Sequence, residues 1–325
     1  MNTNPLVFDS VFCDWMSLRH DYPIDRPGKA LESGRIIKID RDGVIEFDKG
    51  TWDQIQCVSS DTSVRVKCDG LHLWMTGNIG RFQQPDNFLG HPVIECVEKF
   101  ADMITVLGLD PHMFGTRMRL GSVSESGTHL TRLDLTGNFY VSDYPALLSA
   151  TSVRRIGQKL PMMGKYGPTW GYDTKRSNWL KAKIYDKTAE MEGRRVYSRG
   201  ATNARMEVQL GSEYLKRHHL DQVENWKEGN NMENVIYGKF AEQVFRESVS
   251  AEDWSEIPDR MRHHAILWRD GVDIRSQLSK AAFYKARKKL LEYGIDIGTP
   301  CNVIAFTRQV KVVEIIPLNG LRSAA

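Results

Sequence analysis

The sequence has few cysteines, and none of them stands in a pairing pattern. Its 325 residues include five cysteines, an odd number, and no two form a Cys-x-x-Cys pair. A disulfide scaffold and a zinc site are therefore not expected, whereas reduced thiols in a cytosolic protein are. The five are Cys13, Cys57, Cys68, Cys96 and Cys301.

Long apolar runs and the common hydrolase motifs are also missing. No stretch approaches the roughly 18 consecutive apolar residues of a membrane span. The start, MNTNPLVFDSVFCDWM, has no basic segment before a long apolar core, so we expect no signal peptide. A Walker A loop, an HExxH pair and a serine elbow are all lacking, which excludes the usual NTPase and hydrolase classes. We expect a cytoplasmic protein with no membrane partner and no nucleotide cofactor.

The composition is that of an ordinary globular protein of about two domains. Hydrophobic residues make up 41% and charged residues 26%, and the net charge is +3 with a pI near 8.5. This mild basicity is compatible with nucleic acid but does not require it. The basic residues concentrate in two regions, Arg154–Arg217 and Arg275–Lys289.

Three short stretches alternate polar and apolar residues with a period of two, which is typical of half-buried strands. They are His129–Thr136, Leu180–Lys187 and Ala204–Leu210. If they are neighbours in one sheet, one surface holds two carboxylates, a tyrosine and several cations. Those side chains are Arg132, Asp134, Lys183, Tyr185, Lys187, Arg205 and Glu207.

Such a surface has the groups needed to cut a phosphodiester. The carboxylates of Asp134 and Glu207 can hold a hard divalent ion such as Mg²⁺ or Mn²⁺. The ion and the cations can stabilise the charge of the transition state, while Tyr185 attacks phosphorus and keeps the cut strand as an ester. This chemistry is that of a DNA nickase. The alternative is a solvated salt-bridge surface, the commoner meaning of alternating charges on a strand.

A glycine- and aromatic-rich segment, Gly164–Tyr172, precedes the second stretch and is followed by Lys175 and Arg176. Rings interleaved with cations suit single-stranded DNA, whose bases stack and whose phosphates need positive charge. Packing of the same rings on the sheet is an equally good interpretation.

The remaining pattern predicts an α+β fold: a central, mostly antiparallel sheet with helices packed on it. Alternating runs joined by turns predict hairpins at 35–47 and 63–75. Apolar residues at helical spacing predict helices at 92–107, 144–160, 231–249 and 259–268, and Ser212 predicts a helix start. Residues 1–30 are predicted to be irregular. We divide the chain into a nicking domain, 1–248, and a smaller DNA-binding C-terminal region, 249–325.

The C-terminal region contains a basic helix predicted at 279–294. Exposed cations at Lys285, Arg287 and Lys288 would let it enter the major groove as part of a helix-turn-helix or winged-helix arrangement. The alternative is an ordinary charged surface helix.

The nine histidines do not form a His-x-His triplet. His218 and His219 are adjacent, so on a helix they diverge and cannot chelate one ion, and His263 and His264 fail in the same way. We assign the histidines structural or surface roles. His129, five residues before Asp134, is expected on the opposite face of a regular strand.

Three segments together resemble the filamentous-phage replication initiators, the gene II protein family with its shorter X-type members. They are TRLDLTGNFYV (131–141), WLKAKIYDKTAEM (179–191) and NARMEVQLGSEYLKRHHL (203–220). The segment FYKARKKLLEYGIDI (283–297), near the C-terminus, is similar to the family's end. The resemblance runs from about residue 60 to 316.

The resemblance implies a rolling-circle initiator that nicks the plus strand at the origin and later recloses the displaced strand. It implies Tyr185 as the nucleophile, Asp134 and Glu207 as acidic positions, and Arg132, Lys187 and Arg205 as phosphate-binding cations. Origin DNA is the implied partner, with the host helicase and polymerase, in the bacterial cytoplasm. Lys187 is expected on the strand face of Tyr185, where it would lower the phenol's pKa from about 10.

Two other functions stay open: a non-catalytic origin-binding or regulatory protein, and a metal-dependent nuclease that uses water. A second tyrosine would let one protein both cut and rejoin, and Tyr172 and Tyr214 are both candidates.

Overall fold

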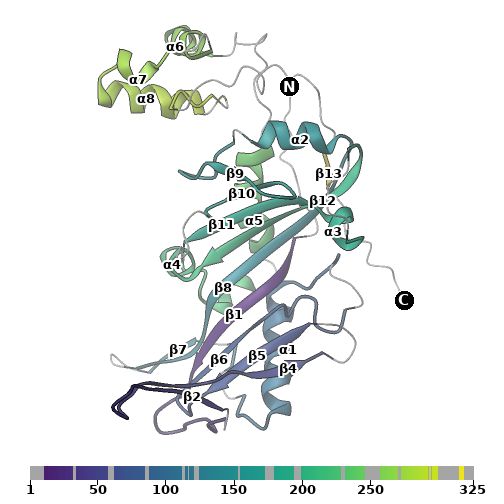
Figure 1. Ribbon diagram of the computed structural model, residues 1–325, viewed down its shortest axis with the longest axis vertical. Coiled ribbons are helices and arrows are strands. Elements are labelled where there is room, and N and C mark those ends of the chain that lie inside the picture. The colour runs from purple at the N-terminus through teal and green to yellow at the C-terminus, as the bar shows by residue number, and fades with distance from the viewer. Residues whose placement is uncertain are drawn as a thin grey trace.

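The computed structural model has an antiparallel sheet at its centre (Figure 1). The structure describes residues 11–31, 34–57, 62–84, 88–111, 114–115, 117–120, 124–152, 154–172, 179–193, 199–227, 231–245, 257–269, 272–291, 293, 295–298 and 315–317. Within these ranges the sheet has eleven strands, and its main path runs β4-β5-β6-β1-β8-β12-β11-β10-β9.

The main-path strands, in that spatial order, are β4 (Asp53–Gln56), β5 (Ser63–Cys68), β6 (His72–Gly77), β1 (Phe12–Asp21), β8 (Ser124–Val141), β12 (Thr202–Gly211), β11 (Leu180–Asp186), β10 (Pro168–Trp170) and β9 (Pro161–Met163). Strands β7 (Arg117–Leu120) and β13 (Ile315–Pro317) also pair with β8. Every pairing is antiparallel, which confirms the predicted fold class.

The helices are α1 (Val93–Val106), α2 (Tyr144–Thr151), α3 (Lys187–Met191), α4 (Ser212–Arg217), the 3₁₀ helix η1 (Val223–Trp226), α5 (Met232–Phe245), α6 (Asp259–Arg269), α7 (Ile274–Gln277) and α8 (Lys280–Leu291). No helix in the described part of the chain is long and apolar enough to cross a membrane.

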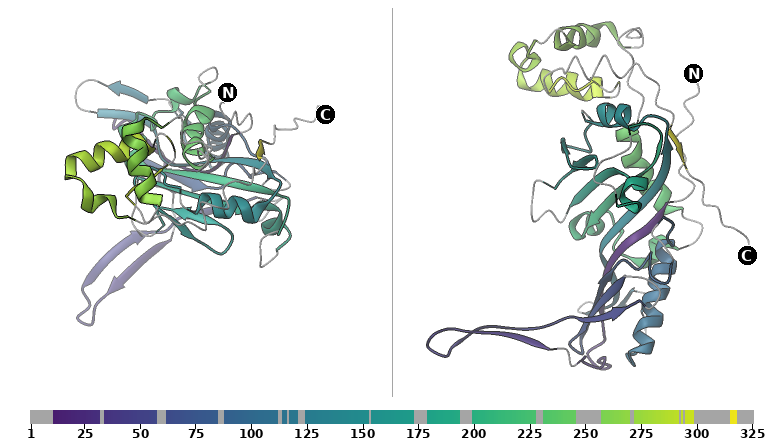
Figure 2. Two further views of the ribbon diagram at one scale, coloured as in Figure 1. Left: turned by 90° about the horizontal axis from the view of Figure 1, so that it is seen from above. Right: turned by 45° about the vertical axis from the view of Figure 1, so that its right-hand side comes forward.

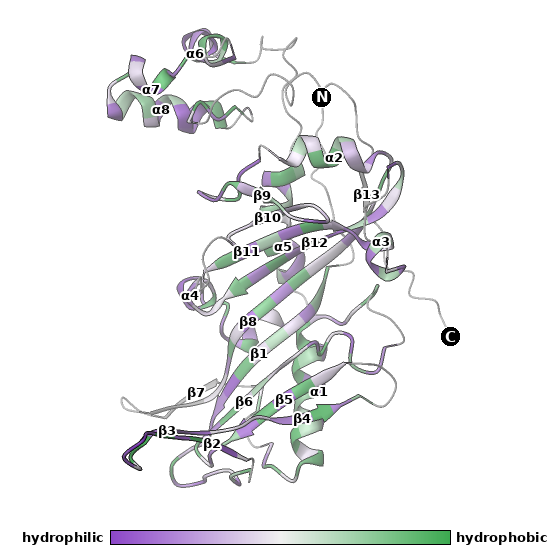
Figure 3. Ribbon diagram, in the orientation of Figure 1, coloured by the Kyte–Doolittle hydropathy of each residue, from purple (hydrophilic) through white to green (hydrophobic). Residues whose placement is uncertain are grey.

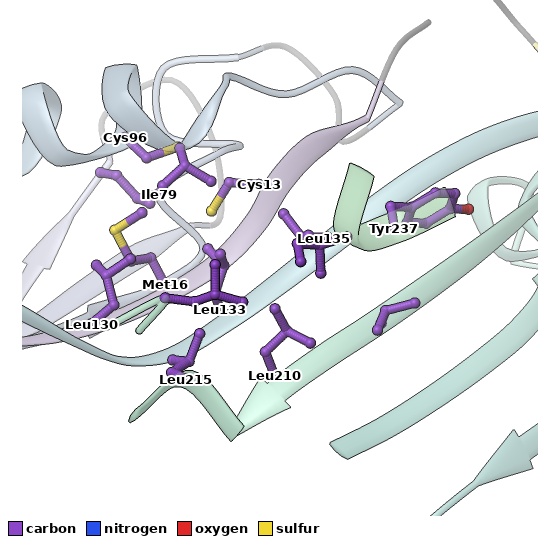
Figure 4. Packing of buried hydrophobic residues seen from close by; sticks show 14 of the residues in the cluster. Cys13, Met16, Ile79, Cys96, Leu130, Leu133, Leu135, Leu210, Leu215 and Tyr237 are labelled. Atoms are coloured by element: carbon purple, nitrogen blue, oxygen red, sulfur yellow. The ribbon is translucent and has the colours of Figure 1, made fainter. Parts of the chain in front are cut away.

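The two faces of the sheet differ because side chains alternate along each strand. On β8, Leu133 and Leu135 are fully buried on the face that α5 covers. Tyr237 of α5 donates from its hydroxyl to the backbone oxygen of Met206 at 3.3 Å. Figure 4 shows these apolar side chains gathered together, and Figure 3 shows hydrophilic and hydrophobic bands alternating along the strands. The polar residues of the predicted surface therefore share the opposite face.

Both predicted hairpins are confirmed, as β2 (Arg35–Ile39) with β3 (Ile45–Gly50) and as β5 with β6. The β2–β3 hairpin forms a separate sheet that projects from the body as an arm (Figure 2). The helices predicted at 92–107, 231–249, 259–268 and 279–294 are confirmed, as is the helix start at Ser212.

The prediction of irregular structure for residues 1–30 is wrong in part, because Phe12–Asp21 forms β1 beside β8. The register between these strands shifts between Cys13 and Trp15 and again between Ser17 and Leu18. Each shift breaks the period-two pattern, so the strand has no clean alternation in its sequence.

The helix predicted at 144–160 is too long, since α2 ends at Thr151. The hydroxyl of Thr151 bonds back to the carbonyl of Leu147, and Gly157 then takes a positive φ of 59° in a turn closed by Ile156 and Lys159. Helix backbone cannot continue through a left-handed residue.

The C-terminal helices α6, α7 and α8 surround their own apolar cluster, which includes Trp268, Phe283 and Leu290. The predicted boundary at 248/249 lies outside the described residues. An ion pair of 2.5 Å joins Asp296, just after α8, to Arg155, just after α2. Strand β13 also returns to β8, with Ile315 opposite Val141.

The loop after β6 contains a glycine, Gly80, that leaves no room for a larger residue. A Cβ atom at Gly80 would lie 1.8 Å from the carbonyl oxygen of Cys13. We therefore expect Gly80→Ala to lower the free energy of unfolding by at least about 2 kcal/mol, because β1 backbone would have to move. Urea denaturation followed by circular dichroism measures this loss.

Gly238→Ala on α5 is the matched control. A Cβ atom there meets nothing within 4 Å, and alanine favours a helix by roughly 0.5–1 kcal/mol over glycine. Equal stabilities for the two variants would show that Gly80 is not packed against β1.

Candidate functional site

The three predicted stretches are neighbours in the sheet, in the order β8-β12-β11. Glu207 on β12 lies opposite Thr136 on β8 and opposite Lys183 on β11. Directly opposed residues of paired strands point to the same face. The predicted acid and cation positions are therefore brought together on the polar face.

Tyr185 and Glu207 form a short polar contact on this face. The Tyr185 hydroxyl donates a hydrogen bond of 2.6 Å to Oε1 of Glu207. Lys183 Nζ lies 2.8 Å from Oε2 of Glu207 and 5.0 Å from the centre of the Tyr185 ring. One carboxylate therefore holds the phenol with one oxygen and the ammonium with the other.

The pKa of the Tyr185 phenol is raised, whereas from the sequence we expected Lys187 to lower it. Burial and then the Glu207 carboxylate raise the pKa of its phenol well above the usual value, against a smaller opposing effect of Arg205. The phenol is consequently protonated at neutral pH, and any reaction in which it acts as a nucleophile needs an acceptor for its proton. The carboxylate of Glu207 is within hydrogen-bond distance of that proton.

Lys187 does not lie on the strand of Tyr185, contrary to the prediction. Strand β11 ends at Asp186, whose carboxylate accepts from the backbone N–H of Ala189 and so begins α3. Lys187 is the first residue of α3, has no exposed surface, and donates to Glu190 at 2.5 Å. Burial lowers its pKa, as does Arg205.

Asp134 is the second acid of the face. Arg132 grips it with two hydrogen bonds of 2.9 and 2.6 Å, and the same guanidinium lies 5.1 Å from the Trp15 ring. Burial raises the pKa of Asp134 to about 6 against the effect of Arg132, and the charges of Glu207 and Asp14 add to the rise.

Asp14 is a third carboxylate of this face, and sequence reasoning missed it. It sits between Cys13 and Trp15, at the register shift where β1 pairs with β8. Asn78 donates to it at 3.2 Å, and burial followed by Glu207 raises its pKa. The only sequence signal is an acid inside an otherwise apolar run, and that signal does not indicate which face the acid joins.

Arg205 was expected on a phosphate, but its side chain has no exposed surface. Its Nε donates to the Asn138 side chain at 2.7 Å and its Nη2 to the backbone oxygen of Phe88 at 3.0 Å, while the Phe12 ring lies 5.4 Å away. The segment at Phe88 covers the guanidinium. Arg205 therefore acts beneath the surface as a fixed positive charge near Tyr185 and Asp14.

Two predicted cations of the sheet remain open to solvent. The side chains of Arg132 and Lys183 are 37% and 36% exposed. Lys175 and Arg176 lie outside the described residues. These two accessible cations, Arg132 and Lys183, flank the acids and can reach a bound phosphate.

On the C-terminal helix α8 the prediction is correct for two residues and wrong for one. Lys285 and Lys288 are exposed. Arg287 is buried, and its Nε and Nη2 donate to the two carboxylate oxygens of Asp296, at 2.6 and 3.1 Å. It ties the end of α8 to the following segment instead of facing outward.

His129 lies away from the acids of the face. Its ring nitrogens approach Asp21 at 3.7 Å and Asp221 at 3.9 Å. In the described part of the chain no group of three or more histidine, cysteine or acidic side chains is gathered around one point as metal ligands.

The donor chemistry at Asp134 nevertheless suits a hard cation. Mg²⁺ is commonly held by one or two carboxylates, with waters and substrate phosphates in its other positions. Glu207 raises the pKa of both Asp14 and Asp134, and Asp14 also raises that of Asp134. A bound cation would favour the charged carboxylates and oppose this rise. The buried hydroxyl of Thr136, opposite Glu207, has no hydrogen-bond partner among the described residues.

The raised pKa of Asp134 predicts a specific dependence of stability on pH. In the folded protein the carboxyl keeps its proton up to about pH 6, whereas in the unfolded chain it loses it near its ordinary value. The folded state therefore binds more protons between these values, and this contribution to the unfolding free energy falls as pH rises. We expect Asp134→Asn, relative to the native protein, to gain roughly 2–3 kcal/mol between pH 3 and 7.

Urea unfolding at several pH values measures this difference. Asp259→Asn, on the exposed first turn of α6, is the control and should shift little over the same range. A gap between native protein and Asp134→Asn that does not vary with pH would contradict the assigned environment.

The fold and this face define the class of the protein. An antiparallel sheet with a tyrosine, acids and accessible cations on one face, followed by a basic helical region, is suited to nucleic acid. The model for the N-terminal family of the phage replication-associated protein encoded by gene II matches residues 7–229, and the one for its C-terminal family matches residues 256–323. The protein is thus a phage replication protein of the initiator class.

The chain belongs to the gene II family of replication-associated proteins of filamentous phages. It is 21% identical to the replication-associated protein of this family from Enterobacteria phage I2-2 over 318 residues, which covers 88% of this chain and 89% of that protein. It is 23% identical to the protein of the same name from Escherichia phage If1 over 312 residues, covering 78% and 95%. The resemblance noted in the sequence is confirmed.

Proposed function

We propose that this protein starts rolling-circle replication by nicking the plus strand of a phage origin and holding the new 5′ end on Tyr185. The observation that carries the proposal is the 2.6 Å hydrogen bond from the Tyr185 hydroxyl to Glu207, beside two accessible cations. A phenol held by a carboxylate is the arrangement of an activated nucleophile and its base.

In the proposed reaction the Tyr185 oxygen attacks the scissile phosphorus while its proton passes to Glu207. The bond from phosphorus to the 3′ oxygen breaks, Glu207 releases the proton to solvent, and the 3′ oxygen takes up a proton from solvent. It leaves as a free 3′ hydroxyl for the host polymerase. Arg132 and Lys183 bind the non-bridging phosphate oxygens, where negative charge increases in the transition state. The fixed charge of Arg205 favours the phenolate as it forms.

Rejoining is the reverse reaction. A 3′ hydroxyl attacks the phosphotyrosine and its proton passes through solvent to Glu207, which gives a proton to the phenol as the strand closes. The ester conserves the energy of the broken bond, so the cycle needs no nucleotide cofactor. The host helicase and polymerase are proposed partners, since strand displacement and synthesis must lie between the two transfers.

Mg²⁺ or Mn²⁺ completes the proposal. Asp134, with Glu207 or Asp14, would hold the ion, which supplies charge neutralisation at the scissile phosphate. In the described arrangement Arg132 grips Asp134, so an ion would have to displace that guanidinium. Binding of Mn²⁺, followed by electron paramagnetic resonance, should be lost in Asp134→Asn without any DNA present.

The C-terminal helices are the proposed second DNA contact. Exposed Lys285 and Lys288 follow one side of α8, and the neighbouring Tyr284 is 50% exposed. These residues would hold duplex next to the nick through its phosphates. The ion pair between Arg155 and Asp296 sets where this region lies relative to the sheet.

An origin oligonucleotide separates this function from its alternatives. We expect a protease-sensitive adduct at the 5′ end of the cut, and mass spectrometry of the trapped peptide should find the nucleotide on Tyr185. Binding without cleavage would instead indicate a non-catalytic origin-binding protein. Cleavage that leaves a free 5′ phosphate would indicate a nuclease that uses water.

A further inference from the structure

Tyr172 is a partly exposed tyrosine next to the polar face of β11. It follows β10 and its ring lies 5.2 Å from Nζ of Lys181 on β11. It also interacts electrostatically with Lys183 on β11 and with Arg132 on β8. Arg132 and Lys183 are bonded to the acids Asp134 and Glu207, so the Tyr172 phenol lies near the same cluster of charges.

Both phenols therefore interact with the same acids. Tyr185 bonds to Glu207 directly and lies opposite Arg205 in the sheet. Tyr172 interacts electrostatically with Glu207 and Asp134. The two tyrosines also differ in access, since Tyr172 is 44% exposed whereas Tyr185 is mostly covered.

Tyr214, the alternative suggested by sequence, lies elsewhere. It is 8% exposed and packs among the rings of Trp179, His218 and Phe240, with centroid distances of 5.1, 4.3 and 5.9 Å. Its ring belongs to the apolar core of the protein. A strand end cannot reach its hydroxyl without opening that core.

The proposed function creates a need that one tyrosine does not meet. After a round of synthesis Tyr185 still carries the old 5′ end, while the regenerated origin must be cut again before the displaced strand can close. A second hydroxyl beside the first would make the second cut without release of the first ester. This step is unimolecular, so it gains the advantage of proximity over capture of another protein.

We propose that Tyr172 is this second nucleophile, an inference that rests on the function assigned to Tyr185. The Tyr172 oxygen forms a bond to the phosphorus of the regenerated site, and the bond to its 3′ oxygen breaks. The phenol's proton ends on that 3′ oxygen. The new 3′ hydroxyl attacks the Tyr185 ester, closes the old strand and returns a proton to Tyr185. Tyr172 now carries the new 5′ end, and no other reactant is consumed.

A two-step challenge tests the inference with the full-length protein. The protein first cuts a labelled origin oligonucleotide and is freed of excess substrate. It then receives a second uncut oligonucleotide of different length, and peptides are mapped by mass spectrometry. We expect the first adduct on Tyr185 and a second one on Tyr172 in the native protein.

Variants give a second, independent reading. In Tyr172→Phe the ratio of second to first adduct should fall at least 100-fold. Tyr22→Phe, at a tyrosine just after β1 whose hydroxyl donates to the backbone oxygen of Asp110, should keep the native ratio. Mapping of the native protein remains decisive if Tyr172→Phe fails to fold.

Different failures have different meanings. An adduct that only ever maps to Tyr185, with a native ratio in Tyr172→Phe, overturns the role of Tyr172 alone. A second step whose rate rises in proportion to protein concentration overturns it too, because the second tyrosine then comes from another copy. Absence of any adduct in the native protein overturns the function of Tyr185 as well.

Discussion

The Tyr185→Phe protein is expected to bind an origin oligonucleotide with near-native affinity and to form no covalent adduct in the first step. The change removes one oxygen, the only atom of this side chain able to bond to phosphorus. The ring keeps its position over Lys183, whose ammonium lies 5.0 Å from the ring centre. We expect the rate of nicking to fall by at least 10⁴-fold, measured by denaturing gel electrophoresis of end-labelled DNA.

The control for this variant is Tyr22→Phe, which removes the same atom from a tyrosine outside the acid cluster and should cut at the native rate. Retention of nicking in Tyr185→Phe, with a free 5′ phosphate on the product, would show that water is the nucleophile. Loss of binding together with nicking would show that the phenol has a structural role.

Glu207→Gln is expected to slow formation of the covalent adduct by about 10²–10⁴-fold, the range that general-base catalysis provides. The amide keeps the shape of the side chain and can still accept a hydrogen bond from Tyr185, but it cannot take up the proton. The phenol must then lose its proton to solvent. Because its pKa is raised, the rate in this variant should still be increasing at pH 9–10.

The rate of adduct formation as a function of pH measures this effect, and Glu213→Gln, exposed on the first turn of α4, is the matched control. Mn²⁺ binding by the same variant separates two roles for Glu207. A pH profile of native shape combined with lost Mn²⁺ binding would contradict the role as base and make Glu207 a metal ligand only.

Both experiments test the hydrogen bond between Tyr185 and Glu207. The strand pattern had predicted Glu207 as a metal ligand instead. Its oxygens are bonded to Tyr185 and to Lys183, at 2.6 and 2.8 Å. Asp134 is bonded to the partly exposed Arg132, which an ion could displace. In the proposed function Glu207 is therefore assigned as the base and Asp134 as the metal ligand.

Local pattern was enough to place most of the candidate site on one surface. The alternation in β8, β11 and β12 depends only on the extended backbone, which sends every second side chain to the same side. Arg132, Asp134, Lys183, Tyr185 and Glu207 follow this rule and lie together. The approximate ranges of α1, α5, α6 and α8 were predictable for the same reason, since helical spacing of apolar residues is local.

Lys187 and Arg205 are the two site residues whose surroundings this alternation did not predict. Alternation predicted Lys187 beside Tyr185, but the Asp186 side chain caps α3 and turns the backbone out of the strand one residue earlier. Arg205 does lie on the predicted face, but the segment at Phe88, more than a hundred residues away in sequence, covers it. The helix cap at Asp186 is a local effect that competes with strand pairing. The burial of Arg205 depends on a contact between distant segments of the chain.

From its residues alone, this chain establishes its family, its antiparallel α+β character and which side chains share each strand face. Folding in three dimensions adds the carboxylate of Asp14 from β1, the hydrogen bond of Tyr185 to Glu207 rather than a neighbouring lysine, and the contact of Tyr172 with Lys181 beside the acids. Periodicity describes one strand at a time. The order of strands, their register shifts and the loops that cover them depend on pairing between segments far apart in the chain, and these decide which charges meet.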